Sequence, residues 1–151
     1  NDTFSDITGT LSGSDRDSAD TVSFELDGSS ASSEVGFTVE KSSTYGTFYL
    51  NATSGAYKFV ANDSAIEALK TTATATFDVN ATDGVADSTA QTITITLNGA
   101  NDTPVLNVVT SGSYTDTAAN DTFSDITGTL SGSDRDSADT VSFELDGSSA
   151  S

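Results

Sequence analysis

The stretch Thr92-Ile-Thr-Ile-Thr-Leu97 decides the fold class of this chain. Its apolar residues alternate with threonines, and a period of two is typical of a β-strand with one buried face. A similar alternation, Ala-Thr-Phe-Asp-Val, occupies residues 75–79. The pattern therefore predicts two long strands, at residues 74–81 and 90–98, joined by the loop 83–87.

Shorter alternating segments precede these two strands. They lie at residues 7–11, 22–26, 35–40, 45–50 and 56–61. The stretch Asn51-Ala-Thr-Ser-Gly55 is typical of a hairpin connection. Seven or eight short strands, separated by turns every 8–12 residues or so, predict an all-β fold of the two-sheet β-sandwich type. A single short helix is predicted at residues 64–70, with Ser64 as its N-cap and Glu67 at the capping-box position.

The chain repeats itself. Residues 1–32 recur without change as residues 120–151, an offset of 119 residues. A period of this length is the size of a whole domain, which indicates a tandem array of globular units rather than a solenoid. We predict that residues 1–100 are most of one repeat without its first strand, that residues 101–104 are the linker, and that residues 105–151 begin the next repeat.

This division leaves open strand edges in both parts of the chain, and open edges favour pairing with other strands. The expected partners are therefore neighbouring repeats of the same chain, together with other copies that pair through the incomplete edges. No run of apolar residues approaches the length of a membrane span, so membrane insertion is not expected.

The composition restricts the partners and the chemistry. Asp plus Glu number 23 against 5 Lys plus Arg, which gives a net charge of −18. Such a charge argues against nucleic acid or an anionic membrane as a partner. The absence of Cys and His removes disulfides, thiolate metal sites and the usual catalytic bases, and no recognisable catalytic motif remains. An enzyme is therefore not expected.

The most distinctive motif is Ser-Gly-Ser-Asp-Arg-Asp-Ser-Ala-Asp-Thr, at residues 12–21 and again at residues 131–140. It crowds three aspartates into six residues, where their carboxylates repel one another. Two interpretations follow from the motif alone. Ca²⁺ takes six to eight oxygen ligands and is suited by short Asp side chains on a loop. Asp and Ser also favour solvated turns for local reasons of hydrogen bonding.

Several motifs bear a family resemblance. Val79-Asn-Ala-Thr-Asp-Gly84 and Asn98-Gly-Ala-Asn-Asp-Thr-Pro-Val105 resemble the end of the VCBS-type and cadherin-like repeats of large bacterial RTX adhesins. Residues 128–140 resemble the beginning of these repeats, and residues 45–57 resemble their middle hairpin. The resemblance implies an Ig-like or cadherin-like extender module of an adhesin, extracellular at the bacterial surface, with Ca²⁺ at the junctions between modules.

The resemblance also implies which residues bind the metal. Where this chain matches the family's motifs, the implied Ca²⁺ ligands are Asp15, Asp17, Asp20, Asp83, Asn101, Asp102, Asp134, Asp136 and Asp139. One departure is visible at Leu50-Asn-Ala-Thr53, which stands where true cadherins carry an acidic strand-end motif. The module that carries this stretch is therefore expected to offer fewer Ca²⁺ ligands.

Two functions of different kinds remain in competition. In the first, Ca²⁺ at the junctions turns a flexible string of modules into a rigid extender. In the second, a face of the sandwich binds glycan or another copy of the protein.

Overall fold

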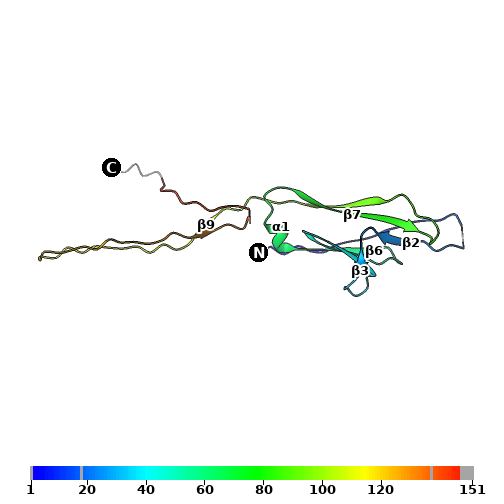
Figure 1. Ribbon diagram of the computed structural model, residues 1–151, viewed down its shortest axis with the longest axis horizontal. Helices are drawn as coiled ribbons and strands as arrows, with labels where there is room; N and C mark the ends of the chain where they lie inside the picture. The colour runs from blue at the N-terminus through cyan, green and yellow to red at the C-terminus, as the bar shows by residue number, and fades with distance from the viewer. Residues whose placement is uncertain (1, 18, 137, 147–151) are drawn as a thin grey trace. The chain divides into compact units, whose positions relative to one another are not determined.

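The computed structural model describes residues 2–17, 19–136 and 138–146 of the chain. The chain divides into two compact units, residues 1–101 (unit 1) and residues 102–151 (unit 2). Their ribbons are shown in Figure 1, and each unit is described by itself. Asp102 and the residues that follow it belong to unit 2, so most of the expected linker 101–104 lies within that unit.

Unit 1 is built from antiparallel strands in two sheets. The first sheet has the order β1-β6-β5-β4-β3 and the second has the order β2-β7-β8. The strands are β1 (Ile7–Thr10), β2 (Ser23–Leu26), β3 (Ser30–Ala31), β4 (Val39–Ser43), β5 (Gly46–Leu50), β6 (Ala56–Ala61), β7 (Ala73–Thr82) and β8 (Gln91–Leu97). The all-β prediction is confirmed, and the two long strands are β7 and β8.

The core lies between the two sheets. Phe48 of β5 and Phe59 of β6 face Phe77 of β7, and the ring centroids of Phe48 and Phe77 are 4.7 Å apart. All three rings are almost fully buried. The alternation that predicts β7 and β8 is the cause, because it places Ala75, Phe77 and Val79 of β7, and Ile95 and Leu97 of β8, on the buried face.

The strand predicted at residues 35–40 begins later than expected. Val35, the first residue of the predicted segment, is 95% exposed, and β4 starts only at Val39. The reason is Gly36, whose φ of +92° belongs to a turn that a side chain would disfavour. The alternation of apolar residues thus continues in the sequence across a turn, and Gly36 is the residue that indicates the turn.

The helix prediction was right in existence and wrong in its cap. Helix α1 spans Asp63–Glu67, and its N-cap is Asn62 rather than Ser64. Ser64 lies inside the first turn and donates a hydrogen bond to Asn62 Oδ1. Within the part of the chain that the structure describes, no helix has the length and apolarity needed to cross a membrane.

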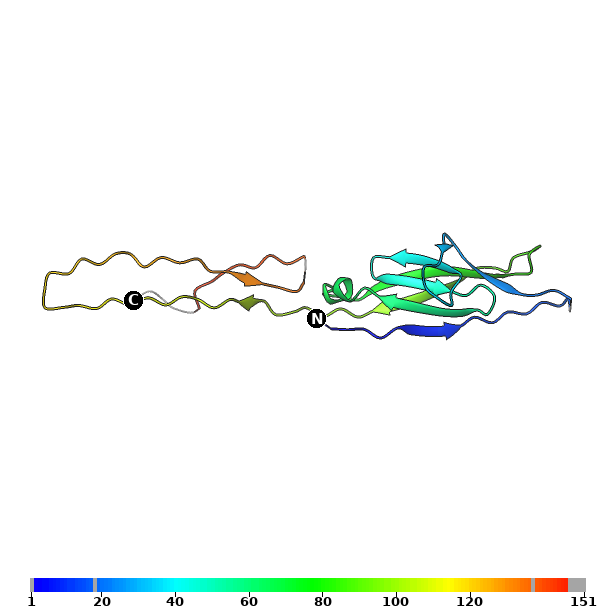
Figure 2. The same ribbon diagram turned by 90° about the horizontal axis from the view of Figure 1, so that it is seen from below.

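Unit 2 contains a long hairpin, whose two arms run side by side in Figure 2. Strand β9 (Val105–Leu106) pairs antiparallel with β10 (Gly132–Ser133). The same register continues along the arms, where the Asn107 N–H donates to the carbonyl of Ser131. It reaches Tyr114, whose hydroxyl donates to the carbonyl of Ser124 at 2.8 Å.

We expect Phe77→Ala to destabilise unit 1 by about 3–5 kcal/mol, because it removes the buried ring of β7 that packs against Phe48 and Phe59 of the other sheet. Urea unfolding followed by tyrosine fluorescence measures the change. Val35→Ala is the matched control, since an exposed side chain should alter stability by less than about 0.5 kcal/mol. Equal effects of the two substitutions would contradict the assignment of the core.

Candidate metal centre

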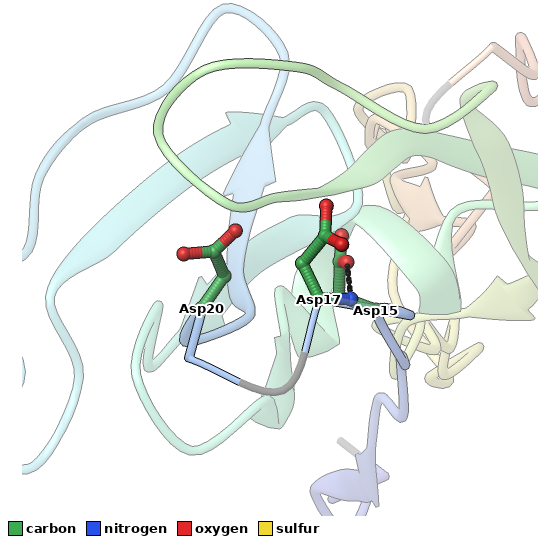
Figure 3. A group of neighbouring side chains, drawn as sticks. All are labelled: Asp15, Asp17 and Asp20. Atoms are coloured by element: carbon green, nitrogen blue, oxygen red, sulfur yellow. Dashed lines mark hydrogen bonds between the residues drawn. The ribbon is translucent and has the colours of Figure 1, made fainter.

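The loop between β1 and β2 carries the first aspartate triplet. The Asp17 N–H donates to Asp15 Oδ1 at 2.7 Å, and the Asp20 N–H donates to the carbonyl of Asp17 at 3.0 Å. These bonds close a turn that brings together one carboxylate oxygen from each aspartate, all within 4.8 Å of one another. The three side chains project from the same side of the loop in Figure 3 and are all exposed.

The second copy of the loop forms the same turn in unit 2. The Asp136 N–H donates to Asp134 Oδ1 at 2.8 Å, and the Asp139 N–H donates to the carbonyl of Asp136 at 2.9 Å. One oxygen from each of these three residues again lies within 4.8 Å of the others. The local sequence therefore specifies the turn and the convergence of the carboxylates in both units.

The two loops differ in the burial of the central aspartate. Asp136 is only 1% exposed, whereas the equivalent Asp17 is exposed. The Asp102 N–H donates to Asp136 Oδ2 at 2.8 Å. The other oxygen, Oδ1, is buried without a hydrogen-bond partner. Because a buried polar atom of this kind is costly, it points to a ligand that satisfies it.

The residues before the turn of the unit 2 hairpin explain why Asp136 is buried and Asp17 is exposed. In unit 2, β9 pairs with β10 immediately before the loop, and Asp102 lies close to the loop itself. In unit 1, the residues equivalent to β10 are Gly13 and Ser14, and they belong to no strand. Identical loop sequences thus give an exposed triplet without this segment and a partly buried one with it.

Asp83 was implied as a ligand, and it lies close to the first loop. A pocket of about 220 Å³ in unit 1 is lined by Asp15, Asp83 and Asp87, among other residues. Asp83 Oδ1 accepts hydrogen bonds from the N–H groups of Val85 and Ala86, each at 2.7 Å. These backbone donors hold the pKa of Asp83 below its ordinary value. The carboxylate therefore remains ionised in mild acid.

Asp87 was not among the predicted ligands. It reaches the pocket because its backbone bridges to Thr82 at the end of β7, which folds the loop back on itself. The signal that was overlooked is a second aspartate four residues after Asp83 in a loop between two strands.

The structure places eight of the nine predicted ligands in two groups. Asp134, Asp136 and Asp139 come together in unit 2, where Asp102 joins them through its backbone N–H. Asp15, Asp17 and Asp20 come together in unit 1, and Asp83 lines the same pocket as Asp15. Asn101, the remaining residue, is exposed at the end of unit 1.

The chemistry of both groups is uniform. Each offers several carboxylate oxygens, and the chain contains neither His nor Cys. Hard oxygen donors of this kind suit Ca²⁺ better than Zn²⁺ or Cu²⁺, which favour nitrogen and sulfur. The unit 2 group fits a cation best, because Asp136 Oδ1 is buried and accepts no hydrogen bond.

Comparison with known proteins adds no relative. The chain matches no protein-family model, no curated protein sequence and no solved structure.

We expect the stability of unit 1 in chelator to depend on the ionisation of Asp83. Because its pKa is lowered in the folded state, the group stabilises the fold above its ordinary pKa of 3.8, and this contribution is lost as the pH falls through the folded pKa. Urea midpoints of wild type and Asp83→Ala should therefore differ at neutral pH and converge in acid.

Asp83→Asn is the control for this experiment. It keeps an oxygen that accepts the two N–H groups but cannot ionise, so its midpoint should change less with pH than that of wild type. A constant gap between wild type and Asp83→Ala from neutral pH to pH 2 or so would contradict the prediction.

Proposed function

We propose that this chain is a Ca²⁺-binding structural repeat, an Ig-like extender module of a bacterial cell-surface adhesin. The observation that carries the proposal is the carboxylate of Asp136. It is 1% exposed, one of its oxygens accepts no hydrogen bond, and the carboxylates of Asp134 and Asp139 converge on it. A divalent cation neutralises this repulsion and supplies the partner that Asp136 Oδ1 needs.

Three carboxylates that meet in a partly buried loop are expensive without a counter-charge. Burial removes the water that would screen their repulsion, and the same burial strengthens their attraction to a cation. Ca²⁺ accepts six to eight oxygens in a flexible arrangement, so Asp134, Asp136 and Asp139 supply part of its shell. The backbone bond from Asp102 fixes the other oxygen of Asp136 and thereby orients its carboxylate.

The position of the loop in the chain supports a structural function. Gly99 packs so closely against Leu69 that a Cβ at this position would overlap the backbone of Leu69, so residue 99 is held by unit 1. Asp102 is held by the metal loop of unit 2. Only Ala100 and Asn101 separate these two anchors. A cation that fastens the Asp136 loop therefore acts at the start of unit 2, where freedom between repeats would arise.

Repetition and charge support an extracellular extender. An unchanged stretch of 32 residues, repeated at an interval of one domain, supplies length rather than new specificity. Extracellular modules bind Ca²⁺ with dissociation constants of roughly 10⁻⁴–10⁻³ M, which matches external but not cytosolic Ca²⁺. A chain with a charge of −18 also gains from bound cations, because they reduce its self-repulsion.

We expect Asp136→Asn to abolish the tightest Ca²⁺ binding, because it removes one charge from the buried centre of the unit 2 loop. Asp17→Asn is the matched control, since it makes the same substitution in an identical sequence whose aspartate is exposed. Isothermal titration calorimetry measures both variants. Loss of the tightest site in Asp17→Asn, with binding retained in Asp136→Asn, would reject the assignment of the site.

We also expect Ca²⁺ to stabilise and stiffen the chain. About 10 mM Ca²⁺ should raise the free energy of unfolding by about 1.4–2.7 kcal/mol for the dissociation constants given above. Chelation should lower the melting temperature and reduce the maximum dimension in small-angle X-ray scattering. Mg²⁺ at the same concentration is the control for ionic strength. If chelation changed neither measurement, the extender function would be wrong.

A further inference from the structure

The two copies of the repeated sequence differ in what covers them. Phe24 and Leu26 of β2 are 8% and 4% exposed in the core of unit 1. Their equivalents in unit 2, Phe143 and Leu145, are 45% and 89% exposed. In the described part of unit 2, residues 141–146 form no strand. The same apolar residues are thus buried in unit 1 and exposed in unit 2.

The site between the sheets of unit 1 that buries Phe24 and Leu26, here called the seat, is also present in unit 1 of every other copy of the chain. Because residues 120–151 repeat residues 1–32 without change, they carry the same side chains with which β1 and β2 contact the strands around them. Residues 123–133 would take the place of residues 4–14 against β6, and residues 142–145 would take the place of β2 against β7.

The hairpin of unit 2 does not obstruct this placement. In unit 1 the Leu11 N–H donates towards β6, to the carbonyl of Gly55. In unit 2 the residue equivalent to Ser12, which is Ser131, accepts from Asn107 of the other arm. Since consecutive residues of a strand direct their backbone groups to opposite edges, the β6 side and the hairpin side are different edges.

The edge that the hairpin arm would occupy is open in unit 1. Strand β1 is the last strand of its sheet and has a neighbour only on the β6 side among the described residues. Its position at the border of unit 1 is visible in Figure 2. Residues 105–114 would therefore extend the sheet by one strand without displacing any other.

A chain cannot make this arrangement with its own unit 1 while keeping the hairpin. Leu97, at the end of β8, pairs with Ala73 at the start of β7. Asp102 would have to lie by the loop next to Thr82, at the far end of β7, about 30 Å away for a strand of this length. The five residue steps from Leu97 to Asp102 reach at most about 18 Å. The seat must belong to a second copy.

We propose that residues 120–146 of one copy replace residues 2–27 in unit 1 of a second copy. The exchange preserves the contacts of the seat, because the sequences are identical. It also releases residues 2–27 of the second copy from unit 1, and their gain in conformational entropy offsets part of the entropy that residues 120–146 lose. The contact joins different surfaces of the two copies, so it propagates head to tail.

Engineered cysteines test the exchange, since the natural chain has none. Asn80 Nδ2 donates to Glu25 Oε2 at 3.0 Å, so residue 144 should lie beside residue 80 of the second copy. With a short bis-maleimide in chelator, N80C/E144C should give a ladder of cross-linked oligomers that weakens on dilution. The control N80C/E25C should cross-link within one chain in dilute solution and lose this cross-link as the concentration rises, because residue 25 leaves its place beside residue 80. If N80C/E144C remained entirely monomeric at high concentration, the proposal would be overturned.

Two matched glycine variants add an independent check. A Cβ at Gly9 would overlap the ring of Tyr57, whereas a Cβ at the equivalent Gly128 meets nothing within 4 Å in unit 2. Gly9→Val should therefore unseat the chain's own β1 and increase the ladder of N80C/E144C. Gly128→Val should abolish the ladder, because its side chain would meet Tyr57 of the second copy. Equal ladders in both variants would refute the exchange.

Discussion

The carboxylate of Asp136 imposes the strictest constraint in this molecule. Among the described residues it is the only charged side chain that is buried, and its burial depends on the segment that begins at Asp102. The same ten-residue sequence in unit 1, where no strand pairs with Gly13 and Ser14, leaves its aspartates exposed. The difference between a solvated turn and a candidate metal site thus lies outside the loop, in the arm of the hairpin that precedes it.

The core of unit 1 and the acidic loops perform separate tasks. Phe48, Phe59 and Phe77 hold the two sheets together without involving any aspartate. The loops are therefore free to carry charge that a core could not tolerate. Acidic residues gather where β7 and β8 are joined and where β1 leads to β2, so the Asp83 loop and the Asp15 loop share a pocket.

Much of the fold was predictable because alternation of apolar residues reports directly on burial. It identified β7, β8 and the hairpin of β5 and β6, whose side chains pack on one face. It failed at Val35, where a turn at Gly36 interrupts an apolar period that continues in sequence. It also failed at the helix cap, because Asn62 and Ser64 are both good capping residues and only the chain path selects between them.

The candidate site was predictable in composition but not in burial. The spacing of Asp134, Asp136 and Asp139 indicates that their carboxylates converge, and they do. No property of that motif distinguishes it from residues 15–20, because the two sequences are the same. Only the pairing of β9 with β10, two residues long, separates them. Such a short pairing has no periodicity of its own, so its effect on Asp136 emerges only in three dimensions.

Two identical stretches could each occupy the same place in unit 1, and the short connection between the units limits which of them can do so. The side chains of residues 1–32 and residues 120–151 are the same, so sequence alone does not decide which of the two stretches pairs with strands β6 and β7. Loop closure selects weakly between such alternatives, since its cost grows only with the logarithm of loop length. Reach selects strongly. The five residue steps from Leu97 to Asp102 are too few to return the hairpin along β7 to its own sandwich. On the proposed exchange, the short connection directs each hairpin to the sandwich of another copy, with no difference in sequence between the repeated segments.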